Sequence, residues 1–210
     1  MKKILVVTSS LMGEMSQSRK IALTLADSVR AALPDWKLNV RDATQLPLIT
    51  LDYLGGLRAK PEQLSAAQQT AVNLGDQVIA EVEEADIVIV AAPMYSYTVP
   101  AALKVWIEYM NRPGRVFSHG AEGAVGLLTG KKVFAVLTRG SEFAVGDTSN
   151  FQENFLVSVL GSFGLAPVQI ILAEGTAHEG GKAALAAAEQ AAHAAGQQLA
   201  QELVKQQAKA

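Results

Sequence analysis

The sequence predicts a doubly wound α/β fold, in which a five-stranded parallel sheet carries helices on both faces. Two observations predict it. Short runs rich in β-branched residues alternate with longer segments of helical periodicity, and the runs Ile4–Val7 and Ile87–Ala92 are apolar at every position. Continuous apolar runs are typical of parallel strands buried on both faces, and strands alternating with helices favour right-handed crossovers. With 210 residues, no internal repeat and no linker, residues 1–210 are predicted to form one domain.

The first helix is predicted between the strands at 4–7 and 38–40. Its apolar residues recur at every fourth position and form one stripe, Ile21, Leu25, Val29 and Leu33. Pro34 ends this helix, because proline cannot continue the hydrogen-bond pattern. The strand at 38–40 is more polar than the others and is placed at or near an edge. Residues 44–61 are predicted to be irregular, because they contain two prolines and two glycines.

The second helix begins with the spacing of a capping box, in which Ser65 and Gln68 each satisfy a backbone N–H of the other. It leads into the strand at 87–92. Pro100 then stands where the next helix begins, a position that proline favours, and this helix is predicted over 101–111.

A glycine-rich segment, residues 113–130, interrupts the alternation. A connection of this length is usually functional or mobile, and we interpret it as an insertion that contributes to a pocket or a dimer contact, with a plain surface loop as the alternative. The remaining elements are predicted as strands at 133–137 and 168–172 and helices at 151–163 and 182–207.

Composition excludes several classes of function. The chain has no cysteine, which removes thiol nucleophiles, cysteine-bound zinc and iron–sulfur clusters. Lysine and arginine total 18 against 20 acidic residues without a basic stripe, so no nucleic-acid partner is expected. None of the three histidines, His119, His178 and His193, has a partner at metal-ligand spacing, so no metal is expected.

No membrane association is expected from the apolar segments. The apolar start of the chain stops at Thr8, which is too short for the core of a signal peptide. No later segment approaches the roughly 20 apolar residues of a membrane span. The protein is therefore predicted to be cytoplasmic.

The loop after the first strand is predicted to bind a phosphate. Ligands of open parallel sheets bind beyond the carboxyl ends of the strands. This loop lacks the glycine patterns of dinucleotide and triphosphate sites but carries Ser10, Ser16, Gln17 and Ser18 before a helix. Hydroxyls and free N–H groups at a helix N-terminus suit one terminal phosphate. Simple capping of the helix by one of these serines is the alternative.

The loop after the third strand is predicted to hold a flat heteroaromatic ring. It contains Met94, Tyr95, Ser96 and Tyr97. Aromatic side chains stack on such rings, and methionine sulfur packs against ring edges. The alternative is that these side chains pack into the core.

The loop after the fourth strand adds Thr138, Arg139, Gly140 and Ser141. The glycine allows close backbone approach to a ligand, and the hydroxyls can hydrogen-bond it. An ordinary turn would explain this loop taken alone. The occurrence of three such loops at one edge of the sheet favours a common site.

Together the loops resemble those of the FMN-dependent NADH-azoreductases, also described as NADH:quinone reductases, over essentially the whole chain. The matching segments are Ser10 with Ser16-Gln17-Ser18, Ala91 to Tyr97 (A-P-M-Y-N-F in the family), Thr129-Gly130-Lys131-Lys132, and Thr138-Arg139-Gly140-Ser141 (S-R-G-G). Three positions depart from the family, namely Ser96 for Asn, Tyr97 for Phe and Ser141 for Gly. These departures leave flavin binding expected but place acceptor preference in doubt.

The resemblance implies a flavodoxin-like fold and an oxidoreductase that holds FMN at the residues of the three loops. It implies ping-pong transfer of hydride equivalents from NADH or NADPH to a quinone or azo acceptor, with no catalytic side chain because the flavin performs the transfer. It also implies a homodimer with the flavin at the subunit boundary. Phe117 and His119 are then candidate substrate contacts from the neighbouring subunit, although a loop histidine can equally be only solvated.

Other classes of function remain as alternatives. A flavodoxin-like electron carrier would be shorter and more acidic than this chain, and a non-catalytic flavin-binding regulatory protein would share the fold without the activity. A phosphoester hydrolase would need a nucleophile with a base or a cluster of carboxylates, and the sequence has neither pattern.

Overall fold

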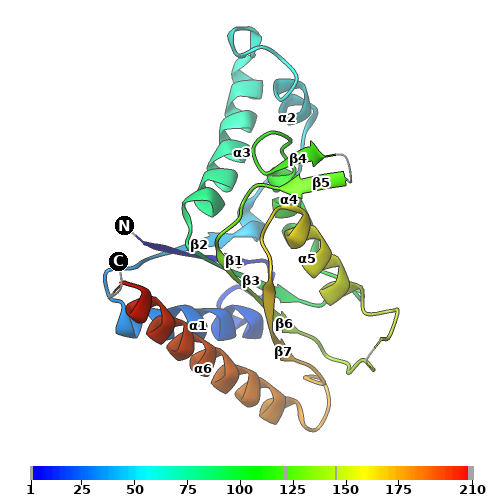
Figure 1. Cartoon of the computed structure of the whole chain (residues 1–210). Helices are drawn as coiled ribbons and strands as arrows, with labels where there is room; N and C mark the ends of the chain where they lie inside the picture. The colour runs from blue at the N-terminus through cyan, green and yellow to red at the C-terminus, as the bar shows by residue number, and fades with distance from the viewer. Residues whose placement is uncertain (1, 121–122, 145, 208–210) are drawn as a thin grey trace.

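The computed structural model describes residues 2–120, 123–144 and 146–207. Its centre is a parallel sheet of five strands in the order β2–β1–β3–β6–β7 (Figure 1). The strands are β1 (Lys3–Thr8), β2 (Lys37–Asp42), β3 (Ile87–Pro93), β6 (Lys132–Thr138) and β7 (Val168–Ala173). This order confirms the predicted flavodoxin-like fold, and the polar strand β2 lies at an edge as expected.

Helices cover both faces of the sheet. Figure 1 shows α1 (Gln17–Ala32) beside α6 (Gly181–Gln207) on one face. The other face carries α2 (Leu51–Gly56), α3 (Ala66–Glu84), α4 (Ala101–Met110) and α5 (Phe151–Ser162). The capping box predicted at Ser65 and Gln68 opens α3, with both of its hydrogen bonds present.

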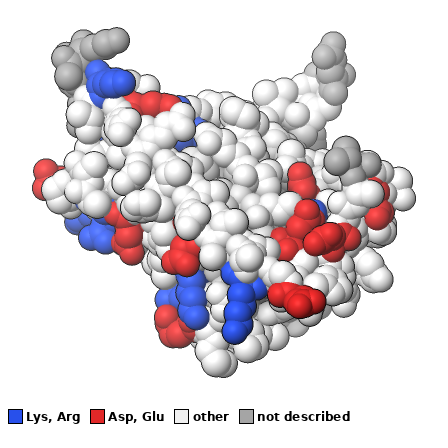
Figure 2. Space-filling model, turned by 90° about the horizontal axis from the view of Figure 1, so that it is seen from below, with Lys and Arg blue, Asp and Glu red and all other residues white. Residues whose placement is uncertain are grey.

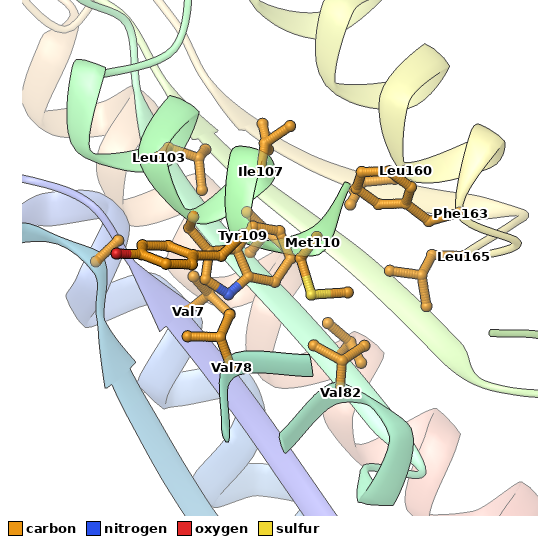
Figure 3. Packing of buried hydrophobic residues seen from close by; sticks show 14 of the residues in the cluster. Val7, Val78, Val82, Leu103, Ile107, Tyr109, Met110, Leu160, Phe163 and Leu165 are labelled. Atoms are coloured by element: carbon orange, nitrogen blue, oxygen red, sulfur yellow. The ribbon is translucent and has the colours of Figure 1, made fainter. Parts of the chain in front are cut away.

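Each face of the sheet buries its own apolar core. On the four-helix face, Val78 of α3, Leu103 of α4 and Leu160 of α5 are fully buried and converge above the strands (Figure 3). Burial of one such side chain contributes about 1.5–3 kcal/mol. These contacts fix the helices on the sheet, and with them the loops at the strand ends.

The prediction of an irregular segment at 44–61 was wrong. This segment contains α2 and two short 3-10 turns, Ala43–Gln45 and Pro61–Gln63. Thr50 caps α2 by accepting from the N–H of Tyr53 at 3.2 Å. The ring of Tyr53 is buried edge-on against Tyr109 of α4, with centroids 5.0 Å apart. Tertiary packing thus overrides the glycines that disfavour a helix here.

The glycine-rich segment 113–130 is more ordered than a loop. It contains an antiparallel hairpin of β4 (Phe117–Gly120) and β5 (Gly123–Gly126), and residues 121–122 lie outside the described part of the chain. The hairpin packs against the C-terminal end of α5, where Leu128 donates its N–H to the carbonyl of Phe163 at 3.0 Å. Three glycines among its eight strand positions hid the alternation that would have indicated strands.

Arg115, just before this hairpin, ties it to α3. Its Nη1 lies 2.8 Å from Asp76 Oδ1, and its Nε and Nη2 each lie 2.8 Å from an oxygen of Glu83. The hydrogen bonds from Arg115 lower the pKa of Glu83, and partial burial opposes the shift. On the face drawn in Figure 2, basic side chains likewise stand beside acidic ones, and further acidic side chains gather on the right, toward the loop between β6 and α5.

We expect Arg115→Gln to lower the free energy of unfolding at neutral pH by up to about 1 kcal/mol, the range of partly exposed ion pairs. Because the pKa of Glu83 is lowered in the folded state, this stabilisation is complete above the unfolded-state glutamate pKa of about 4.3. It is lost as the pH falls through the lower folded-state value. Urea unfolding of both proteins at about pH 7 and about pH 3 measures the difference; a difference that is equal at both values contradicts the prediction.

Candidate active site

The predicted cofactor-binding residues lie on one continuous rim at the carboxyl ends of three neighbouring strands. The loops after β1 and β3 meet where Ser10 Oγ lies 3.1 Å from the hydroxyl of Tyr95. The loops after β3 and β6 meet where Met94 donates its N–H to the carbonyl of Thr138 at 2.7 Å. The strand order β1–β3–β6 therefore places the three predicted loops next to one another.

The loop after β1 forms a cradle of hydroxyls at the start of α1. Ser16 is the N-cap of this 16-residue helix, and its Oγ accepts from the N–H of Arg19 at 3.3 Å. The same Oγ lies 3.1 Å from Ser18 Oγ, and both serines are buried. Capping uses a lone pair of the Ser16 hydroxyl, and the hydrogen bond between the two serines uses one of their two hydroxyl hydrogens, which leaves the other available. The N-terminus of the helix adds a favourable potential for an anion.

The one acidic side chain of η1 (Gly13–Met15), which lies within this loop, is neutralised locally. Glu14 Oε1 lies 2.8 Å from Arg19 Nη2. Gln17, the first residue of α1, is exposed beside the two buried serines. The arrangement can therefore accept a phosphate without facing an uncompensated carboxylate.

The loop after β3 is a tight turn with a strained backbone. Tyr95 and Thr98 exchange both backbone hydrogen bonds, at 3.0 and 3.2 Å. Between them, Ser96 (φ 49°) and Tyr97 (φ 68°) both adopt the left-handed conformation. Such two-residue turns strongly prefer asparagine and glycine. Residues other than asparagine and glycine that adopt the left-handed conformation concentrate at functional sites. The conformation of Ser96 and Tyr97 therefore supports a functional role for this turn.

The aromatic side chains of this turn face outward. Tyr97 is 60% exposed and Tyr95 37% exposed. The alternative that these rings pack into the core is therefore wrong. Two half-exposed or exposed rings next to the hydroxyl cradle can instead contact a planar ligand.

The loop after β6 holds its arginine away from solvent. The Nε and Nη2 of Arg139 lie 3.0 and 2.7 Å from Glu174 Oε2, and its guanidinium lies 4.8 Å from the ring centroid of Phe143. The arginine is 4% exposed. The sequence placed Arg139 among the ligand contacts, but its side chain pairs with Glu174, and its backbone N–H and carbonyl are also hydrogen-bonded, to Ala173 and Thr176.

Gly140 and Ser141 follow on the same loop. A Cβ at position 140 would lie 3.2 Å from the Cβ of Ala177 in the loop after β7, so the glycine permits close packing between these loops as well as approach to a ligand. Ser141 is exposed and Thr138 is buried at the end of β6.

A cavity of about 530 Å³ opens beside the strained turn. Ser9, Leu11, Tyr95 and the start of α4 from Pro100 to Ala102 are among its lining residues. A larger cavity of about 810 Å³ lies between α2 and α3, away from the rim. Size alone would have selected the larger cavity, whereas Ser9, Tyr95 and Ser96 line the smaller one.

Two other predicted contacts lie far along the fold from this rim. Phe117 and His119 stand edge to face on β4, with ring centroids 5.6 Å apart. Helix α4, which precedes the hairpin, begins at the rim and runs back toward the amino ends of the strands. Within one chain, therefore, the structure does not bring Phe117 and His119 to the other site residues.

The other histidines have no place in the site. His178 lies in the loop after β7, and His193 Nδ1 lies 2.7 Å from Ser28 Oγ between α6 and α1. Across residues 2–120, 123–144 and 146–207, no group of three or more histidine, cysteine or acidic side chains is arranged to hold a metal ion.

Sequence reasoning missed two buried polar side chains at the base of the strained turn. Ser9 Oγ donates to the carbonyl of Ala91, and Gln152 Nε2 donates to the carbonyl of Ala92, each at 2.9 Å. Ser9 stood next to the predicted Ser10 and could have been included. Gln152 is 60 residues from its partner, and no pattern in the sequence links the two.

The sheet order defines a flavodoxin-like α/β protein, and the hydroxyl cradle and the aromatic turn lie at the strand ends, where open parallel sheets bind their ligands. Residues 2–199 match the family model described as "Flavodoxin-like fold", and the chain belongs to this family. An FMN-dependent NADH:quinone oxidoreductase of Vibrio parahaemolyticus is 40% identical over 176 residues, or 83% of this chain and 88% of the relative. One of Azospirillum brasilense is 38% identical over 182 residues, 82% and 86% of the two chains.

A solved structure supports the same assignment. The crystal structure of an azoreductase from Bacillus anthracis matches with a TM-score of 0.84 and 25% identity, covering 94% of this chain and 100% of that one. The resemblance inferred from the loop motifs is thus confirmed. No described helix combines the length and the apolar character needed to cross a membrane.

Proposed function

We propose that this chain is an FMN-dependent oxidoreductase that transfers hydride equivalents from NADH or NADPH to quinones and azo compounds by a ping-pong mechanism. The observation that carries the proposal is the placement of a buried serine pair at a helix N-terminus next to a strained, outward-facing aromatic turn. The names of its relatives, FMN-dependent NADH:quinone oxidoreductase and azoreductase, support the same activity.

The residues present fit flavin mononucleotide. Ser16 and Ser18, with Ser10 and Gln17, would hold the phosphate, because buried hydroxyls and N–H groups at the start of α1 suit one dianion. Met94 to Tyr97 and Thr138 to Ser141 would hold the ring. The chemistry supplied by the bound flavin is acceptance of a hydride from the nicotinamide and donation of two electrons to the acceptor.

The chain itself contributes the positioning of the reactants. The exposed ring of Tyr97 offers a face for a planar donor or acceptor, and the hydrogen bonds across the turn fix it. Holding two planar reactants together contributes to the rate through proximity. No side chain is required as a general acid, because water can protonate the product.

The cavity beside the turn favours an enzyme over an electron carrier. A carrier needs only an exposed ring edge, whereas the 530 Å³ opening next to Tyr95 has room for a small planar substrate. The glycine-rich insertion at residues 113–130 likewise favours an enzyme over a carrier.

The test uses the purified chain with FMN added. We expect a yellow complex with a flavin absorption spectrum, bleaching by NADH without air, and continuous NADH oxidation when a small quinone or azo dye is supplied. Parallel assays with NADPH determine the donor preference. A folded chain that binds no FMN would overturn the proposal, and FMN binding without steady turnover would favour the electron carrier.

We further propose that the protein is a homodimer that associates through its four-helix face and rim. Large exposed apolar side chains concentrate there, on the loops at the rim, α2, the hairpin and α5, whereas Val204 is the example on α6 among the described residues. Contiguous exposed apolar surface marks interaction sites. In such a dimer the partner subunit's Phe117 and the partner subunit's His119 would approach the acceptor, which would explain their distance from the rim of their own chain.

We expect Leu51→Glu to convert the dimer into a monomer. Leu51 is 87% exposed in the single chain, so the change costs the monomer little stability but places a charge in the proposed interface. Size-exclusion chromatography with light scattering gives the mass. The matched control is Val204→Glu on α6, which should stay dimeric. A dimeric Leu51→Glu variant contradicts the proposed face, and a monomeric wild type contradicts the dimer.

A further inference from the structure

A fully buried glutamine outside the predicted site lies at the base of the aromatic turn. Gln152 stands in the first turn of α5 with 0% of its surface exposed. Its Nε2 donates to the carbonyl of Ala92 at 2.9 Å. Only the amide nitrogen can donate to a carbonyl, so the orientation of the amide is fixed. The bond reaches β3 two residues before Met94.

The other half of this amide has no partner. Among the described residues, Gln152 Oε1 is buried without a hydrogen bond. A buried acceptor without a partner lowers stability, and an apolar residue of the same shape would avoid that loss. The glutamine is therefore poorly explained by stability alone, which directs attention to what its Nε2 holds.

The turn above it needs support from its surroundings. Ser96 and Tyr97 both have left-handed backbones, and such strain persists only where neighbouring structure fixes it. Three hydrogen bonds fix its base: Ser9 Oγ to Ala91 O and Gln152 Nε2 to Ala92 O at 2.9 Å each, and Met94 N to Thr138 O at 2.7 Å. The bond from Gln152 is the one that comes from a helix.

We infer that Gln152 is a positioning residue, which holds the Tyr95–Thr98 turn in its strained conformation and so prepares the turn for the flavin ring. The part that concerns flavin rests on the proposed function. The part that concerns the turn depends only on hydrogen bonds within the chain. The two parts of the inference can therefore be tested separately.

The first test measures amide hydrogen exchange in the flavin-free protein. The N–H groups of Tyr95 and Thr98 form hydrogen bonds across the turn, and we expect them to exchange at least about tenfold faster in Gln152→Leu. The N–H of Ile89, in the middle of β3, should exchange at the wild-type rate. The control is Gln198→Leu, because Gln198 is exposed on α6. Unchanged exchange at Tyr95 and Thr98 overturns the inference, whether or not the protein binds FMN.

The second test is FMN titration followed by visible circular dichroism. Under conditions where the apoprotein is folded, we expect Gln152→Leu to bind FMN about tenfold more weakly, with an altered flavin dichroism. Gln198→Leu should match the wild type in both. Wild-type affinity and dichroism in Gln152→Leu would overturn the inference.

Gln152→Glu offers a pH-dependent rescue and covers a leucine variant that fails to fold. A protonated glutamic acid can donate to the Ala92 carbonyl, but an ionised one can only accept. Burial raises the pKa of such a carboxyl. The charged groups around this end of α5 are Glu153, which accepts from Asn150, Asp147, which accepts from Ser149, and Arg139, which pairs with Glu174. Relative to the wild type at each pH, FMN affinity should recover as the pH falls; a constant ratio contradicts the inference.

Discussion

Replacing Ser16 by aspartate is expected to weaken FMN binding by at least about a hundredfold while leaving the flavin-free protein as stable as the wild type. Aspartate caps helices as well as serine does and adds a favourable charge at the helix N-terminus. Toward a phosphate the same carboxylate is repulsive. At about 5 Å and an effective dielectric constant of about 20, each pair of unit charges costs about 3 kcal/mol, which corresponds to more than a hundredfold in Kd.

This variant separates capping from phosphate binding, which both use the hydroxyl of Ser16. Urea unfolding of the apoprotein measures the cap, and a fluorescence titration with FMN measures the cradle. Ser65→Asp is the matched control, because Ser65 caps α3 outside the site, and it should leave both quantities unchanged. If Ser16→Asp binds FMN as tightly as the wild type, the serine only caps its helix and the phosphate lies elsewhere.

The sequence predicts the sheet well because buried parallel strands have a recognisable local pattern. Runs such as Ile87–Ala92 are apolar at every position, and β3 extends only to Pro93 beyond the prediction. The polar strand β2 was placed at an edge for the same reason. Local signals also predict helix starts, since the capping box at Ser65 acts over four residues. These features depend on neighbours in the chain, which the sequence displays directly.

The features that sequence reasoning missed depend on contacts between distant residues. Helix α2 exists because Tyr53 packs against Tyr109. No local pattern reveals that the side chain of Arg139, a residue predicted to contact the cofactor, pairs with Glu174, 35 residues away. Gln152 was missed for the same reason. In each case a polar or aromatic side chain acquires its role only when the fold brings two distant segments of the chain together.

The hairpin in residues 113–130 illustrates a different cause. Its glycines look like flexibility in the sequence, yet one of them is required by close packing. A Cβ at Gly126 would lie 1.9 Å from the backbone nitrogen of Gly164 and 2.3 Å from the carbonyl carbon of Phe163. Backbone atoms cannot rotate away as a side-chain end can. The glycine therefore lets β5 lie directly on the C-terminal end of α5.

We expect Gly126→Ala to lower the free energy of unfolding by about 3 kcal/mol, at the upper end of the usual range for overpacking, because the hairpin must separate from α5. Gly161→Ala, in the last turn of α5, should instead raise the free energy of unfolding. Nothing lies within 4 Å of a Cβ at Gly161, and replacing a helical glycine by alanine stabilises by about 0.5–1 kcal/mol. Urea unfolding of the two variants compares the same chemical change in two environments.

The same variant tests the proposed role of the hairpin, which carries Phe117 and His119. The proposed FMN site lies at the rim of the sheet, so Gly126→Ala should retain FMN affinity at a temperature where it is folded. If the hairpin supplies acceptor contacts to a neighbouring subunit, its displacement should raise the KM for the quinone and leave NADH-dependent bleaching of the flavin unchanged. An unchanged KM in a demonstrably destabilised Gly126→Ala protein would assign the hairpin to structure alone.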